Sequence, residues 1–159
     1  MLDKENFEFI KSIDDNVKKA SMLANLLFKN KKDKGGFPYI GHLQYVSNAF
    51  DDETHKIVGY LHDIIEDTVV SKTILLELGF SSEIVDAVVI LTRDTDDYMK
   101  YINNIKNSNN LLAIDVKLKD LEHNMDIGRI VNPTQKDYER LEQYKKCYKI
   151  LEKKRKELC

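Results

Sequence analysis

Apolar residues recur at intervals of three and four positions along most of this chain, the spacing that places them on one face of an α-helix. Three segments show it most clearly: residues 17–28, 40–50 and 84–91. Gly79 is expected to end a short helix over residues 72–78. Polar residues typical of helix N-caps precede several predicted helices: Ser71, Ser82, Asp94 and Thr134. The pattern predicts an all-α protein whose last helix covers about 134–158.

Two short apolar segments compete as β-strands because they are partly β-branched: VVILT at 88–92 and LLAIDVKL at 111–118. Helix is the preferred interpretation of both. In the second segment Leu111, Ile114 and Leu118 keep the helical spacing, and no glycine or hairpin turn accompanies them. Neither a repeat nor a linker divides the chain, so a single domain over residues 1–159 is expected.

Composition narrows the class of protein further. The chain has 159 residues, of which 42% are hydrophobic and 33% charged, as in a compact globular domain rather than a disordered one. The formal net charge is -2, so the chain lacks the excess of basic residues that is typical of a nucleic-acid-binding protein. Because acids stand where a signal peptide has basic residues, and no apolar run approaches a membrane span, a cytoplasmic protein is expected. Cys147 and Cys159 lie too far apart on one predicted helix for a disulfide, so both are predicted to be free thiols.

The segment GYLHDIIEDT, residues 59–68, combines an apolar stripe with several titratable side chains. Adjacent helical residues point about 100° apart, so His62 and Asp63 can share a metal ion that lies beside the helix. Glu66 and Asp67 follow one turn later, where a carboxylate can handle the proton of a bound water. Taken alone, the segment is also compatible with an amphipathic helix end whose acids are solvated.

Further metal ligands must come from other parts of the chain. The candidates are His42, Asp115, Asp120 and His123. His55 is expected to pack or to lie at the surface. The irregular segment KNKKDKGGFPYIGH, residues 29–42, brings lysines and a Gly-Gly pair to the start of a helix, where free N–H groups and cations can surround an anion. An ordinary solvated turn explains the same composition.

Four motifs follow one another in order: KKD, GFPYIGH, LHDIIEDT and VKLKDLEHNMD. Over residues 31–126 the chain thereby resembles the HD-domain metal-dependent phosphohydrolases. The resemblance is greatest to the RelA/SpoT-type alarmone hydrolase domains and their small stand-alone relatives. It implies a compact all-helical HD-domain bundle that binds one divalent metal ion, usually Mn²⁺.

The resemblance also assigns roles to residues that match the family's motifs. The implied metal ligands are His42, His62, Asp63 and Asp120. Glu66 and Asp67 match the catalytic acid pair, and the implied job of His123 is a structural hydrogen bond. The implied substrate contacts are Lys31, Lys32 and Asn124. Lys31 stands where the family has arginine, and lysine lacks the planar fork that grips phosphate or stacks on a base, which puts guanine recognition in question.

The implied activity is that of a guanosine 3',5'-bis(pyrophosphate) 3'-pyrophosphohydrolase, with a small nucleotide as substrate. The charge of the chain leads us to expect no nucleic-acid or membrane partner. Two alternatives stay open: a phosphohydrolase of another nucleotide or phosphoester, and a non-catalytic, nucleotide-binding regulatory helical module. Tyr98, Lys100 and Tyr101 are expected in the core or at the surface rather than on substrate. A stripe in the last helix predicts core packing or a homodimer face: Tyr138, Leu141, Tyr144 and Tyr148.

Overall fold

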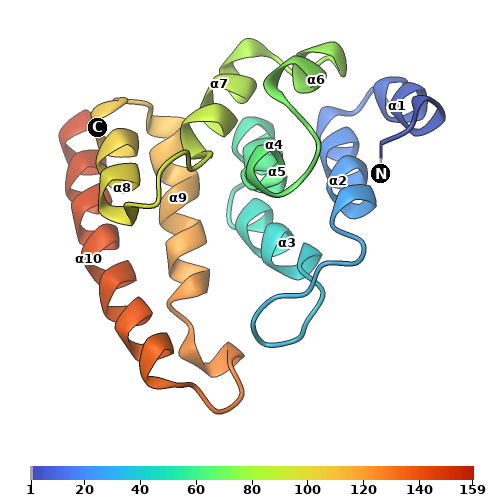
Figure 1. The fold of residues 1–159 in the computed structure, drawn as a ribbon. Coiled ribbons are helices and arrows are strands. Elements are labelled where there is room, and N and C mark those ends of the chain that lie inside the picture. Colours follow the sequence, from blue (N-terminus) through green and yellow to red (C-terminus); the bar gives the residue numbers. More distant parts are fainter. Residues whose placement is uncertain (1) are drawn as a thin grey trace.

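The computed structural model describes residues 2–159 as a chain of helices (Figure 1). In order these are α1 (Lys4–Lys11), α2 (Asn16–Leu27), α3 (Ile40–Asn48), α4 (Glu53–Leu61), α5 (Ile64–Asp67), α6 (Lys72–Glu77), α7 (Ser82–Leu91), α8 (Tyr98–Asn107), α9 (Leu111–Asn124), the 3-10 helix η1 (Ile127–Arg129) and α10 (Gln135–Leu158). The described residues form no strand, only an isolated bridge between Lys32 and Pro38. The predicted all-α class is confirmed. Between residues 2 and 159, no helix combines the length and apolar character that crossing a membrane requires.

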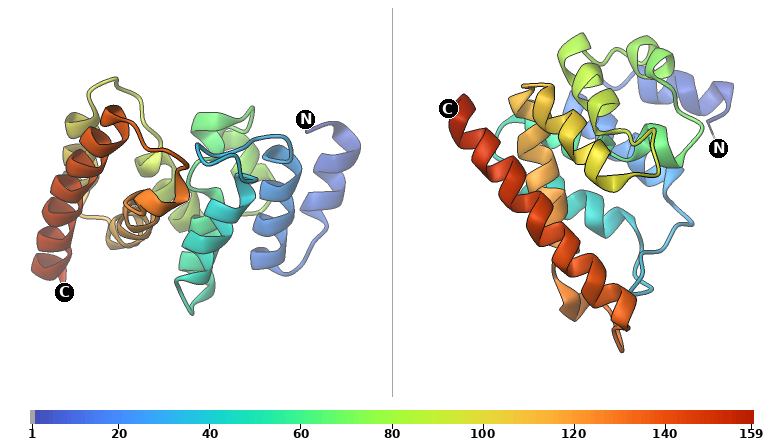
Figure 2. Two further views of the ribbon diagram at one scale, coloured as in Figure 1. Left: turned by 90° about the horizontal axis from the view of Figure 1, so that it is seen from below. Right: turned by 60° about the vertical axis from the view of Figure 1, so that its left-hand side comes forward.

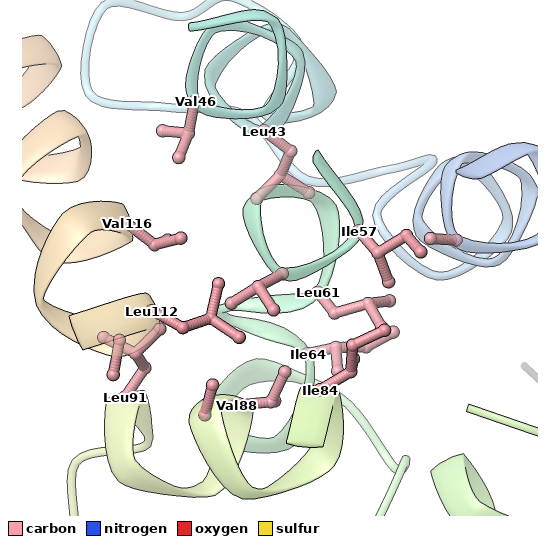
Figure 3. Packing of buried hydrophobic residues seen from close by; sticks show 14 of the residues in the cluster. Leu43, Val46, Ile57, Leu61, Ile64, Ile84, Val88, Leu91, Leu112 and Val116 are labelled. Carbon is pink, nitrogen blue, oxygen red and sulfur yellow. The ribbon is translucent and has the colours of Figure 1, made fainter. Parts of the chain in front are cut away.

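Helix α4 lies at the centre of the bundle, where it contacts α2, α3, α7 and α9. Helix α10 runs along α9 and also contacts α8. Helices α10 and α1 lie at opposite ends of the molecule (Figure 2, left). Buried side chains from four elements meet around α4, as Figure 3 shows for Leu43, Leu61, Val88 and Val116. Because α3, α4 and α9 share this core, any side chains that they direct at one another are held on rigid elements.

Two of the predicted helix caps are wrong by one to three residues. Ser81, not Ser82, caps α7 by accepting a hydrogen bond from the Ile84 amide. Asp97, not Asp94, caps α8. Several capping residues stand side by side at both places, and local sequence does not decide which of them reaches the free amides of the first turn. The caps of α6 and α10 are confirmed: Ser71 and Thr134.

The apolar pattern of residues 59–68 predicts one continuous helix, but the structure divides this segment between two helices. Helix α4 ends at Leu61, Asp63 adopts φ -103° and ψ 1°, and α5 begins at Ile64. The His62 ring contributes to this break, because its Nδ1 donates to the Gly59 carbonyl at 2.7 Å and competes with the backbone for that acceptor. The break therefore lies at the two residues with the most candidate chemistry.

Helices α3 and α4 approach each other closely at Gly59. A Cβ atom at this position would lie 2.7 Å from Cα and 2.8 Å from the amide nitrogen of Ser47, both backbone atoms of α3. No side chain larger than hydrogen fits there without moving a helix. Gly59 thus fixes the spacing between the helix that carries His42 and the helix that leads into His62.

Candidate metal centre

The four predicted metal ligands come together from three parts of the fold. His42 lies on α3, His62 and Asp63 lie at the junction of α4 and α5, and Asp120 lies on α9. His42, His62 and Asp120 are buried, whereas the Asp63 side chain is 18% exposed. One ligand atom from each of His42, His62 and Asp63 lies within 4.8 Å of the others. The group is therefore closed on the protein side and open toward solvent beside Asp63.

Asp120 completes the group. Its Oδ1 lies 2.9 Å from Nε2 of His42 and 3.4 Å from Nε2 of His62. Oδ2 of Asp63 lies 3.2 Å from Nε2 of His62 and 4.0 Å from Nε2 of His42. Two imidazole nitrogens and two carboxylate oxygens thus face one small volume, a donor set that suits a divalent first-row metal ion.

One atom of this group lacks a partner that a cation would supply. Nε2 of His62 is buried, and no group in residues 2–159 makes a hydrogen bond with it, although both carboxylates lie close by. A buried polar atom without a partner costs about 1–3 kcal/mol. The residues present therefore fit a divalent cation bound between the two rings and the two carboxylates.

The Nδ1 atoms of His42 and His62, which face away from the group, both form hydrogen bonds, as is usual for histidines that bind a metal. The bond from Nδ1 of His62 to the Gly59 carbonyl directs Nε2 at the group. Nδ1 of His42 lies 2.7 Å from Nδ1 of His123. Burial, followed by the charge of Arg129, lowers the pKa of His123 to about 4, so that ring is neutral and its Nδ1 can accept from His42. The hydrogen-bonding role predicted for His123 is confirmed.

Tyr39 belongs to the site although sequence reasoning gave it no role. Its hydroxyl donates to Oδ2 of Asp63 at 2.5 Å. Burial, together with the negative charge of Asp63, raises the pKa of Tyr39, so the phenol keeps its proton and remains a donor. The signal that points to Tyr39 is its place in GFPYIGH, three positions before His42.

The ionisable side chains of the group shift one another's pKa values. Burial alone would lower the pKa of His62, but the Asp63 and Asp120 carboxylates outweigh it and raise that pKa well above its ordinary value. Burial opposes ionisation of Asp63, yet the positive charge of His62 lowers its pKa to about 2. Against the same burial, Lys117 and the two histidines hold the pKa of Asp120 well below its usual range. Both carboxylates are ionised at neutral pH and face the volume between them.

Glu66 and Asp67, the predicted catalytic pair, lie next to the group on α5 but are held by different partners. Oε1 of Glu66 accepts from the Arg93 amide at 2.8 Å, and Oδ2 of Asp67 pairs with Nζ of Lys31 at 2.8 Å. Desolvation and the negative charges of Asp63 and Asp67 raise the pKa of Glu66 against that hydrogen bond. A carboxyl group with a raised pKa suits proton transfer near neutral pH.

A cavity of about 330 Å³ adjoins the group at His42 and Tyr39. All three predicted substrate contacts line it: Lys31, Lys32 and Asn124. Sequence reasoning missed several others that follow in the chain, both cationic and apolar: Ile127, Arg129, Ile130, Arg140, Leu141 and Tyr144. Their only signal is the helical stripe that includes Leu141 and Tyr144, which also fits core packing. The cavity thus combines cations with an apolar wall.

Contacts between distant segments shape the cavity. Arg129 donates to Oδ2 of Asp33 at 2.9 Å and to the His123 carbonyl at 2.9 Å, which fastens the lysine-bearing loop to the segment after α9. Nδ2 of Asn124 donates to Oδ1 of Asp120 at 3.1 Å, so the predicted nucleotide contact also touches a predicted metal ligand. The cavity and the metal-ligand group share one wall.

Asp115, an open alternative for the ligand set, lies elsewhere. Its Oδ2 is 2.9 Å from Nε2 of His55, and its Oδ1 accepts from Arg155 at 2.6 Å. Nδ1 of His55 lies 2.7 Å from Oδ2 of Asp52. These side chains line a different cavity, so the structure brings Asp120 rather than Asp115 to His42 and His62.

A similarity to a solved structure supports the all-α fold. No model of a known protein family matches this chain. Over 130 residues it is 32% identical to a GTP pyrophosphokinase of Myxococcus xanthus; the match covers 70% of this chain, but only 17% of that protein's length. A solved structure, described as a metazoan ortholog of SpoT that hydrolyzes ppGpp and plays a role in starvation responses, is similar at a TM-score of 0.71. It is 23% identical, and the match covers 90% of this chain and 93% of that one. The chain therefore has the all-α HD-domain fold of that SpoT ortholog.

Proposed function

We propose that this protein is a metal-dependent phosphohydrolase that removes pyrophosphate from the 3' position of guanosine tetraphosphate. The observation that carries the proposal is the buried, unpaired Nε2 of His62, which faces two ionised carboxylates beside a cationic cavity. The structural similarity to a protein described as hydrolyzing ppGpp supports this choice among phosphate compounds. A small nucleotide is the proposed partner.

The proposed metal ligands are His42, His62, Asp63 and Asp120, and Mn²⁺ is the proposed ion. A bound divalent ion lowers the pKa of a coordinated water and offsets charge on phosphoryl oxygens. The protein supplies the remaining parts. Tyr39 holds Asp63 in place, and the Gly59 carbonyl and His123 hold the two imidazole rings in one tautomer.

In the proposed reaction, water adds to the phosphorus that carries the 3' oxygen, and the bond between that phosphorus and the 3' oxygen breaks. Glu66 removes a proton from the water, a task that suits its raised pKa, and the leaving 3' oxygen receives a proton. The products are guanosine diphosphate and pyrophosphate. Asp67 orients Lys31 at the cavity mouth through their ion pair.

The adjoining cavity accounts for a nucleotide rather than a simple phosphoester. Lys32 and Arg140 offer positive charge for phosphates, while Ile127, Ile130 and Tyr144 offer an apolar surface for a base. The substrate would thus extend from the metal centre, past Asn124, into the space under α10.

The experiment that tests this function is a pyrophosphate-release assay with Mn²⁺ and guanosine tetraphosphate. We expect pyrophosphate and guanosine diphosphate in equal amounts, and no release once a chelator has removed the metal. A panel of nucleoside monophosphates and other phosphoesters, assayed in parallel, identifies a different substrate. A protein that binds Mn²⁺ yet cleaves neither the alarmone nor any compound of the panel would contradict the hydrolase and favour a regulatory nucleotide-binding module.

Replacing Lys31 by arginine is expected to improve binding of the alarmone. Nζ of Lys31 lies 4.4 Å from the centre of the Tyr39 ring and pairs with Asp67. An arginine keeps that ion pair and adds a planar face that can stack on a base. We expect KM for guanosine tetraphosphate to fall about threefold to tenfold while kcat stays within about twofold. Steady-state kinetics of the Lys31→Arg variant measure both.

Lys29→Arg is the matched control, because it makes the same chemical change two residues away, at an exposed lysine that does not line the cavity. It should leave KM nearly unaltered. An unchanged or raised KM in Lys31→Arg would show that position 31 does not contact the base.

A further inference from the structure

Lys117 is a buried cation that none of the predicted roles explains. It lies on α9 with an exposed fraction of 6%, and its Nζ is 2.7 Å from Oδ2 of Asp120. Within residues 2–159, no other carboxylate lies within ion-pairing distance of it. The ring centres of Tyr101 and Tyr98 lie 5.0 Å and 5.5 Å from the ammonium group. A lysine is rarely buried without a specific partner, so the burial of Lys117 requires an explanation.

The aromatic cover explains what α8 does. Tyr101 is 5% exposed and donates to the Leu91 carbonyl, and the Tyr98 ring lies 5.9 Å from that of Tyr144 on α10. Both tyrosines, expected in the core or at the surface, thus enclose Lys117. They shield the ammonium group from water, which strengthens its interaction with every charge nearby.

The two oxygens of Asp120 have separate partners. Oδ1 faces His42 and His62 and accepts from Asn124. Oδ2 faces Lys117. The ammonium group therefore occupies the oxygen that would otherwise be free to turn toward an ion as a second ligand atom.

We propose that Lys117 is a positioning residue that confines Asp120 to one metal-binding oxygen and gives the loaded metal centre a net positive charge. The proposal rests on the metal centre of the proposed function, but not on the identity of its substrate. Two carboxylates and two neutral imidazoles balance a divalent ion, so the buried ammonium group leaves one positive charge in excess. That charge repels the metal ion and attracts a phosphate, both with little screening.

The opposite signs of these two effects make the proposal testable. We expect Lys117→Gln, which removes the charge but retains an amide donor, to bind Mn²⁺ at least about tenfold more tightly than the unaltered protein. We expect the same Mn²⁺-loaded variant to bind inorganic phosphate at least about threefold more weakly. Calorimetry measures the first affinity, and broadening of the phosphate ³¹P resonance by protein-bound Mn²⁺ measures the second.

Lys119→Gln is the matched control. It makes the same change two residues away on α9, where the lysine pairs with Glu122 at 3.1 Å outside the metal-ligand group. It should leave both affinities unaltered. Lys117→Met removes the donor as well, and we expect its Mn²⁺ paramagnetic resonance spectrum to differ from that of Lys117→Gln because Asp120 is then free to turn.

A purely structural lysine would give a different result, since its loss would weaken metal and phosphate binding together. That outcome, or Mn²⁺ affinity in Lys117→Gln no higher than in the unaltered protein, would overturn the proposal. Thermal unfolding of each variant separates either result from a folding defect. Failure of the alarmone assay leaves these binding measurements untouched, so a wrong substrate and a wrong role for Lys117 give different results.

Discussion

Asp63→Asn is expected to lower pyrophosphate release by more than about a hundredfold, because even residues that only orient metal ligands change affinity or activity about 10–100-fold. The substitution keeps the size of the side chain but removes the charge that lies 3.2 Å from Nε2 of His62. It also replaces the carboxylate, whose pKa of about 2 keeps it ionised beside the Tyr39 hydroxyl, by a neutral amide. Mn²⁺ affinity should fall along with activity, and calorimetry with the pyrophosphate assay measures both.

Asp52→Asn is the matched control for this experiment. Asp52 also lies beside a histidine, 2.7 Å from Nδ1 of His55, but outside the metal-ligand group. It caps α4, and asparagine is as good an N-cap as aspartate. Activity should survive in Asp52→Asn. If Asp63→Asn kept its activity as well, the proposed ligand set would be wrong.

Gly59→Ala is expected to destabilise the fold by about 1–3 kcal/mol, the usual cost of forcing an added carbon into a packed interface. The new Cβ would meet the backbone of α3 at Ser47, which cannot yield as a flexible side chain would. Helices α3 and α4 must then separate, and they carry His42 and lead into His62. We therefore expect lower Mn²⁺ affinity in addition to a lower melting temperature.

Gly41→Ala provides the comparison, since a Cβ at that position of α3 has no neighbour within 4 Å. Because alanine favours helix over glycine by up to about 1 kcal/mol, this variant should be as stable as the unaltered protein or more so. Denaturant unfolding of the two variants compares them directly. Equal stability of Gly59→Ala and Gly41→Ala would show that α3 and α4 can move apart freely.

Much of the fold could be predicted because helical faces repeat locally. The spacing of Leu111, Ile114 and Leu118 identifies α9, and Thr134 marks the start of α10 within one residue. Where the prediction was wrong, the deciding contact was not readable from spacing alone. Apolar periodicity continues through residues 59–68, but the bond from His62 to the Gly59 carbonyl accompanies the end of α4.

The candidate site, too, could be predicted from the sequence only in part. His42, His62, Asp63 and Asp120 stand in motifs whose order can be recognised, and the fold brings them together. Whether they bind a metal stays a prediction. In the sequence, nothing distinguishes Lys117 from an ordinary lysine on a helix. Its burial depends on Tyr98 and Tyr101 of α8, which pack against it only in the folded protein.

Arg129 and Arg140 could not be assigned for a similar reason. Arg129 lies at the cavity beside Asp33, its distant ion-pair partner, and Arg140 lines the same cavity from α10, opposite residues 31–39 of the chain. A pattern along the sequence shows which face of a helix is buried, but not which distant segment covers it.

The order of the helices along the chain has a consequence for protein synthesis. Helices α3, α4 and α5 leave the ribosome with His42, His62 and Asp63 before Asp120 on α9 has been made. Until then, α4 lacks the apolar surface of α9 that completes its core. The newly made first half can thus hold at most three of the four proposed ligands. Metal capture is therefore expected to follow translation rather than to start folding, so the protein would be made first and loaded afterwards.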